Sequence, residues 1–367
     1  MSNLTNRKNV VNHIMEQLRA GFTLAAADHI LLCNPSELPE IIKDFCESAK
    51  TEYPVNSTSI AEKIFATTIR MGLNLQGLDG QIVGIPPDIG NEALGILLEK
   101  SQPLEAQDVS SASLAVDMFL KGMESVNSGD SLLSYMAEKI RERIVASRSI
   151  SSFICAFGDI SRQTVYWKMV EKRYCKFGND YARGLEMLRH LGFSQVSTNP
   201  VLAAKAFDED PLLRDQLLDE INTHSDWVSD PKIHGDAMTL SATLMALWPN
   251  LEVFRPLSVR TQNMDYMISF QLNPNIAEDA DASIEDAKNA YNLAAKHLTE
   301  YDQRLGLTNP GAVPPNIVLK VAGSSTAARK ITRELNAAGI GTNNTVVYTV
   351  GQEVQLILDS LREKLEL

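Results

Sequence analysis

The sequence of 367 residues is poor in cysteine and has no long apolar run. Its four cysteines, Cys33, Cys46, Cys155 and Cys175, lack the spacing of metal ligands and are too few for a disulfide framework. A reducing cytosol is the simplest interpretation, so we expect a cytoplasmic protein. No apolar stretch approaches the roughly 20 residues that a membrane span needs. The polar start MSNLTNRKNVVNHIMEQL is unlike a signal peptide.

Positive charge is also scarce. The chain has 34 Lys and Arg against 46 Asp and Glu, a formal net charge of -12. This balance argues against nucleic acid or an anionic membrane as a main partner. It does not argue against a phosphorylated substrate, because a local site binds such a group. The length and an apolar fraction of 44% suit two domains or one large barrel.

Strand patterns are almost missing from the first part of the chain. Apolar residues recur there at helical spacing, as in Val10, Ile14 and Leu18. Only Gln81–Ile85 resembles a strand, and the prolines after it would end it. The sequence therefore predicts a mostly helical N-terminal domain over residues 1–150, followed by a different domain over residues 151–367.

From about Ser149 onward, short apolar runs alternate with helical patterns. We expect strands at Phe153–Phe157, 193–200 (FSQVSTNP), Met267–Leu272, Asn316–Val321 and Thr345–Val350. Ser324, Ser325 and Thr326 are candidate N-caps of the helix after the fourth strand, and Gly339 would end that helix. The alternation predicts an α/β fold of the (β/α)8 TIM-barrel type. It is incomplete, with about five β/α units where a full barrel has eight.

Lys320 stands near the C-terminal end of the fourth expected strand, where parallel barrels place their chemistry. A Schiff-base reaction needs a neutral amine. Free lysine has a pKa of about 10.4, and desolvation in an apolar barrel lowers such a value. Val318, Leu319 and Val321 around Lys320 are compatible with burial. Taken by itself, Lys320 is better explained as a lysine that merely reaches solvent at a strand end.

Residues 316–352 resemble the transaldolase family. In that family a strand ending in I-K-(I/V)-(P/A) carries the Schiff-base lysine, and the next strand carries N-x-T before an alanine- or glycine-glutamine pair. The matching residues are Lys320, Asn343 with Thr345, and Gly351 with Gln352. Earlier segments match in the same order: Thr198-Asn199-Pro200 resembles a family T-N-P, and Ser269 with Gln271 resembles V-S-x-E-V. The T-N-P segment is also a plain helix start, with Asn199 as N-cap and Pro200 at the first position.

The resemblance implies a class I Schiff-base enzyme that transfers a dihydroxyacetone unit between sugar phosphates. Such an enzyme works in carbohydrate metabolism, in the pentose phosphate pathway, without metal or organic cofactor. Lys320 would form the Schiff base and Thr345 would position the catalytic water, with Gln271 in place of a carboxylate that shares this water. The expected substrate-binding residues are Asn199, Ser269, Asn343 and Tyr348. Tyr348 could donate a proton or be an inward core tyrosine.

Two departures from the family pattern leave alternatives open. Aligning Gly158-Asp159 with the family's first-strand pattern D-T-(G/A)-(D/N) puts Ala156 at the acid/base aspartate. Asp159 could substitute for that aspartate, or it could simply cap the next helix. The family's serine-proline-aromatic-x-(G/N)-arginine pattern, which helps hold phosphate, has no counterpart. A homo-oligomer or a missing C-terminal segment would complete the barrel. The alternatives are a fructose-6-phosphate aldolase-type lyase, suggested by Gln271 and Tyr348, or a degenerate, non-catalytic barrel that acts in interaction or assembly.

Overall fold

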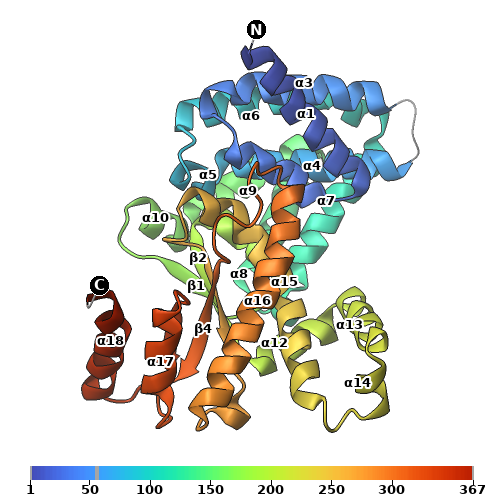
Figure 1. Ribbon diagram of the computed structural model, residues 1–367. Coiled ribbons are helices and arrows are strands. Elements are labelled where there is room, and N and C mark those ends of the chain that lie inside the picture. Colours follow the sequence, from blue (N-terminus) through green and yellow to red (C-terminus); the bar gives the residue numbers. More distant parts are fainter. Residues whose placement is uncertain (1, 54–57, 366–367) are drawn as a thin grey trace.

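A curled parallel sheet forms the centre of the C-terminal part of the chain (Figure 1). The computed structural model describes residues 2–53 and 58–365. Five strands lie in sequence order, and each pairs in parallel with the next. They are β1 Phe177–Asn179, β2 Phe193–Ser197, β3 Met267–Gln271, β4 Ile317–Ala322 and β5 Thr342–Thr345. The fold is an incomplete α/β barrel of the TIM type preceded by a helical region, as the sequence predicts.

The helical region packs around one central helix, α4. Its helices are α1 Ser2–Ala20, α2 Thr23–Asp28, α3 Leu38–Glu52, α4 Thr58–Gln76, α5 Leu78–Ile82, α6 Pro87–Gln107, α7 Val109–Glu124, α8 Leu132–Arg143, α9 Ile150–Gln163 and α10 Val165–Glu171. Helix α4 contacts α2, α6, α7 and α9. Its side chains Ile64, Phe65 and Ile69 are fully buried, because an apolar face at helical spacing must be covered.

The strand expected at Gln81–Ile85 is wrong. Gln81 and Ile82 end the short helix α5. The backbone N–H of Ile85 then donates to Gly80 O, and Gly84 takes a left-handed φ of +103°. A five-residue apolar run without a neighbouring strand has no ladder to join, so local hydrogen bonds fold it into turns.

The strand expected at Phe153–Phe157 is wrong as well, because these residues lie inside α9. Ser149 caps this helix by accepting from Ser152 N at 3.0 Å. Ile150, Phe153, Ile154 and Phe157 are all buried at the spacing of one helix face, against α4, α7 and α8. Since Ala156 lies on this helix, the alignment that placed it at the acid/base position is also wrong. The first strand is β1.

The strands β2, β3 and β4 form where the sequence predicts them. Asn199 caps α12 Pro200–Glu209, and Pro200 occupies its first position. The chain between β2 and β3 continues through α13 Pro211–Thr223, α14 Ser225–Ser229 and α15 Gly235–Arg260. Helix α16 Ala280–Arg304 connects β3 to β4.

The unit after β4 confirms the helix but shifts the last strand. Ser325 Oγ accepts from Ala327 N before α17 Ala328–Ala337, and Gly339 follows this helix with a φ of +77°. The strand expected at Thr345–Val350 is wrong, because β5 ends at Thr345. Val346 has a left-handed φ of +56°, and Val350 begins α18 Val350–Leu365. The β-branched run is thus a turn and a helix start.

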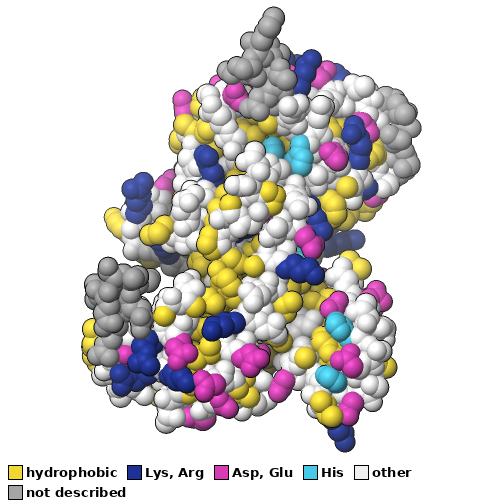
Figure 2. All heavy atoms as spheres, viewed as in Figure 1, with side chains coloured by type: hydrophobic (Ala, Val, Ile, Leu, Met, Phe, Trp, Pro, Cys, Tyr) yellow, Lys and Arg dark blue, Asp and Glu magenta, His cyan; other side chains and the backbone are white. Residues whose placement is uncertain are grey.

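The strands point away from the helical region. Their C-terminal ends lie at the lower end of Figure 1, where α16 and α17 begin. On the face seen in Figure 2, hydrophobic side chains gather in the middle, over the strands, and charged side chains gather at this lower end. Within the described ranges, no helix is long and apolar enough to cross a membrane.

One continuous apolar core extends from the helical region into the sheet, and it includes Ile69, Phe157, Val196 and Leu319. The turn η5 Arg189–Leu191 joins the two parts, because buried Arg189 contacts Asp28 on α2. The division into domains at residues 150 and 151 stays a prediction.

Candidate active site

Polar side chains from four neighbouring strands share one face of the sheet. The register pairs Ser197 with Ser269, then Gln271 with Lys320 and Lys320 with Asn343. Neighbours in register in a parallel sheet point to the same side. The residues that alternate with them, such as Leu319 and Val321, are buried on the opposite, helix-covered side. The polar row therefore lies on the concave face, the interior side of a barrel.

Lys320 lies at the centre of this row. Its side chain is half-buried, and Nζ donates to Ser197 Oγ at 3.2 Å, reaching across β3. The amine is accessible from the concave face and is held by a hydroxyl.

The neighbours of Lys320 are tied to each other and to its backbone. Asn343 Nδ2 donates to Ser269 Oγ at 2.9 Å, and Ser269 is fully buried. Gln271 Nε2 donates to the carbonyl of Lys320 at 3.2 Å and to its own neighbour Leu272 O at 3.4 Å. The structure thus brings together Lys320, Gln271, Ser269 and Asn343, with Ser197 as a member that the sequence patterns missed.

The other expected residues lie around this group. Thr345 pairs in register with Ala322, two residues beyond Lys320 toward the C-terminal end of the strand. Asn199 Oδ1 accepts from Leu202 N at 3.0 Å, which is the helix-cap role. Tyr348 is 77% exposed in the turn after β5, so the interpretation as an inward core tyrosine is wrong. A substrate contact of Asn199 or Tyr348 stays a prediction.

The end of the first strand carries Asn179 and Asp180, which sequence reasoning also missed. Asn179 Nδ2 donates to Tyr181 O at 2.7 Å and to Arg183 O at 3.2 Å, which shapes the turn after β1. The strand has only three residues, one of them Gly178, so its apolar signal is weak. The pair Asn179-Asp180 at its C-terminal end is the signal that could have located the strand end.

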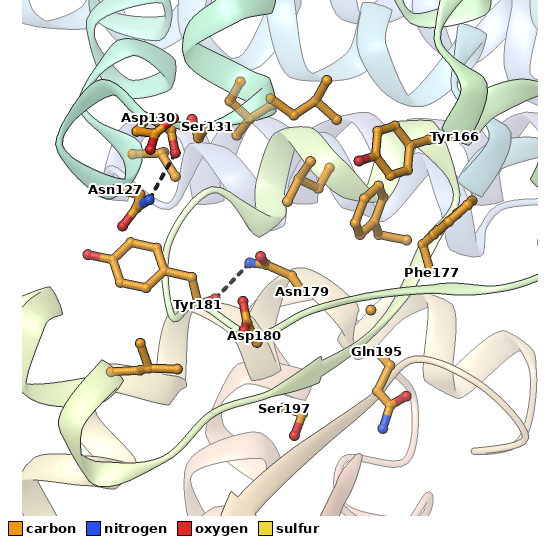
Figure 3. Close-up of a pocket in the computed structure, with 17 residues that line it drawn as sticks. Asn127, Asp130, Ser131, Tyr166, Phe177, Asn179, Asp180, Tyr181, Gln195 and Ser197 are labelled. Carbon is orange, nitrogen blue, oxygen red and sulfur yellow. Dashed lines mark hydrogen bonds between the residues drawn. The ribbon is translucent and has the colours of Figure 1, made fainter.

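A cavity of about 740 Å³ lies beside β1 and β2 (Figure 3). The turn before α8 supplies Asn127, Asp130 and Ser131, the end of β1 supplies Asn179, Asp180 and Tyr181, and β2 supplies Gln195 and Ser197. Tyr166 and Phe177 add aromatic walls, with ring centroids 4.8 Å apart. Ser197 both lines this cavity and accepts from Lys320, so the amine lies one hydrogen bond from the cavity wall.

A parallel α/β half-barrel with a lysine and amide and hydroxyl groups on its interior face defines an α/β-barrel protein with the elements of a catalytic site. Residues 178–359 match the family model of transaldolase/fructose-6-phosphate aldolase, and this part of the chain belongs to that family. The match begins within β1 and ends within α18, so it spans the strands of the sheet and excludes α9. A search of curated proteins found no match. At this coarse level the matched part of the chain is of the transaldolase and aldolase enzyme type.

Proposed function

We propose that the protein is a Schiff-base enzyme in which Lys320 attacks the carbonyl carbon of a ketose and a dihydroxyacetone unit is then transferred to an aldehyde. The observation that carries the proposal is the position of Lys320 Nζ on the concave face, 3.2 Å from Ser197 Oγ and within the family match. Sugar phosphates, as in the pentose phosphate pathway, are the substrate class that the family indicates.

The chemistry needs a proton acceptor besides the amine. Condensation of the amine with the ketone releases water and leaves an iminium. A base removes the proton of the C4 hydroxyl, the C3–C4 bond breaks, and its electron pair moves toward the iminium nitrogen to give an enamine and an aldehyde. The enamine carbon then attacks an acceptor aldehyde, whose oxygen takes up the proton, and water releases the product from Lys320.

We assign the proton transfer to Asp180. It follows β1, at the strand end where the family has its acid/base aspartate, and it lines the same cavity as Ser197. General acid/base groups contribute roughly 10²- to 10⁴-fold to a rate. Thr345 and Gln271 remain our candidates for positioning the water, and Asn343 with Ser269 for binding substrate hydroxyls.

Aldol cleavage without transfer is the second candidate. The observation that favours it is Gln271, whose amide is held against the backbone of Lys320 where the transferase pattern has a carboxylate. Reaction with and without an acceptor aldehyde separates the two functions. We also propose a reducing, cytosolic setting, supported by the free thiols of Cys33, Cys46, Cys155 and Cys175.

Borohydride trapping tests the Schiff base. Reduction in the presence of fructose 6-phosphate should add the mass of the reduced sugar to the peptide that carries Lys320. The Lys320→Arg variant keeps the charge but cannot form this adduct. Lys205→Arg replaces an exposed lysine on α12 and should label like the parent protein. Labelling of another lysine would contradict the role of Lys320, and the absence of any labelling would point to the non-catalytic alternative.

A further inference from the structure

We propose that the cavity beside β1 binds the uncharged, hydroxyl-rich end of the substrate, so the protein favours a polyol without phosphate at that end. This inference rests on the proposed function and names the substrate class of that same site. The cavity adjoins Lys320 through Ser197, and its volume of about 740 Å³ is in the range of small-molecule sites.

Charge is the first argument. The cavity carries the carboxylates of Asp130 and Asp180, on opposite walls formed by the α8 turn and by the end of β1 (Figure 3). Among the described residues that line it, none is Lys or Arg. A phosphate monoester carries a charge of about -1.5 to -2 at pH 7, so it would meet like charges here. Carboxylates instead accept hydrogen bonds from hydroxyls readily.

Two helix N-termini reach the cavity, and side-chain caps use part of their backbone donors. The N-terminus of α8 reaches the cavity at Ser131, where a capping box uses two of the local donors: Ser134 N donates to Ser131 Oγ, and Ser131 N donates to Ser134 Oγ, each at 3.1 Å. The N-terminus of α12 reaches the cavity at Leu202, whose N–H donates to Asn199 Oδ1. Helix N-termini bind anions through free N–H groups, and these caps use such groups internally.

The remaining wall suits a sugar chain. Tyr166, Phe177 and Tyr181 present ring surface to the cavity, and Gln195 brings an exposed amide. A polyol has apolar C–H faces beside its hydroxyls, so it can lie on rings while its hydroxyls reach carboxylates and amides. A phosphate gains nothing from ring faces.

Two measurements test the proposal. In calorimetry, D-glucitol and glucitol 6-phosphate lack a carbonyl and therefore report binding without Schiff-base formation. We expect glucitol to bind at least about fivefold more tightly, as one like charge removed at short range implies. Tighter binding of the phosphorylated polyol, or equal binding, overturns the inference whatever Lys320 does.

The second measurement is the borohydride labelling rate of Lys320 with fructose divided by that with fructose 6-phosphate. Comparing this ratio between variants cancels the different open-chain fractions of the two sugars. Asp130→Asn should lower the ratio about fivefold, whereas Asp215→Asn, an exposed carboxylate on α13 outside the cavity, should leave it unchanged. An unchanged ratio in Asp130→Asn contradicts the inference. If the parent protein is labelled by neither sugar but still binds glucitol more tightly than glucitol 6-phosphate, only the proposed Schiff-base chemistry is contradicted, and the inference about the cavity stands.

Discussion

At the scale of single residues, the densest polar network lies away from the concave face, around Arg189. Its guanidinium donates to both carboxylate oxygens of Asp28, at 2.8 and 2.5 Å, to Asn74 Oδ1 at 2.8 Å and to Val253 O at 2.7 Å. Arg189 and Asp28 are both fully buried. This network joins the helical region to the turn before β2, so it fixes where β2, and with it Ser197, lies relative to the helices.

Removing one partner of this pair should be costly, because the other charge stays buried. Arg189→Met should lower the free energy of unfolding by about 3–5 kcal/mol, measured by urea titration. Arg162→Ala is the matched control, since Arg162 pairs with exposed Asp159 at 3.5 Å and should cost no more than about 1 kcal/mol. Equal losses in the two variants would contradict a structural role of the buried network.

A neighbouring carboxylate, Asp79, makes the stability dependent on pH. Burial is the largest influence and pushes the pKa of Asp79 up, but His190 Nδ1 at 3.1 Å and Arg189 Nε at 3.4 Å outweigh it and hold the pKa below its ordinary value. A carboxyl with a lowered folded pKa stabilises the fold above its unfolded pKa of about 3.9. That stabilisation is lost as the pH falls through the folded pKa.

The Asp79→Asn variant should therefore be clearly less stable than the parent protein at pH 7, and the difference should shrink as the pH falls below about 4. Urea unfolding between pH 7 and pH 3 measures it. A difference that stays constant over this interval would mean that the ionised form of Asp79 is not the stabilising one.

At the scale of elements, helix α9 packs against α4 at a point where only glycine fits. A Cβ added to Gly72 would lie 2.5 Å from Ile154 Cδ1 and 3.1 Å from both of its γ carbons. Ile154 is fully buried and β-branched, so it cannot turn aside. Gly72→Ala should lose about 1–3 kcal/mol of stability through overpacking. Gly122→Ala in α7 has open space and should gain up to about 1 kcal/mol. Denaturant titration measures both changes, and a Gly72→Ala variant as stable as the parent protein would contradict this close packing.

The same helix shows why part of the fold was not predictable. Phe153–Phe157 is a continuous apolar run, which suits a buried strand as well as a buried helix segment. In the structure the segment is a helix, because its apolar residues are buried at helical spacing: Ile150, Phe153, Ile154 and Phe157. This burial requires α4 as a packing partner, which the local sequence does not reveal. By contrast, β2, β3 and β4 each combine an apolar run with a polar end, and this pattern was enough to predict them as strands.

The candidate site was predictable to the same degree. Lys320, Ser269 and Gln271 stand in strands that the pattern predicts, whereas Asn343 lies in β5, which the pattern placed several residues too late. Asp180 was not predictable, because three-residue β1 has too few apolar residues to mark a strand. Ser197 emerged only from geometry, since its contact with Lys320 crosses β3.

At the scale of the whole molecule, the sheet is open on two sides. Within residues 2–53 and 58–365, β1 pairs only with β2, and β5 pairs only with β4. At the two ends of β5, Gly341 O accepts from Leu319 N and Thr345 O accepts from Gly323 N, so these carbonyls face β4. Backbone groups alternate in direction along a strand, so those of Thr342 and Asn344 point away from β4, toward the open edge. Open strand edges pair readily with other chains.

An apolar helix face follows this open edge in the chain. Helix α18, which follows β5, exposes Val354, Ile357, Leu358 and Leu361 by 42–50% of their surface, at the spacing of one helix face. In a complete barrel such a face is covered by further elements. We therefore expect the chain to self-associate through this side, as the incomplete sheet indicates.

Substitution on this face tests the expectation directly. Light scattering of the parent protein should show a mass that rises with concentration. In Ile357→Glu, the concentration at which the protein associates should rise by about tenfold or more, because association would bury a carboxylate without a partner. Leu218→Glu, on exposed α13, places the same charge at a similarly exposed leucine and should leave the association unchanged. The labelling rate of Lys320, followed over the same concentrations, shows whether association completes the site. If the protein stays monomeric and labels Lys320 at full rate when dilute, the half-barrel is competent alone and the open edge has no part in the chemistry.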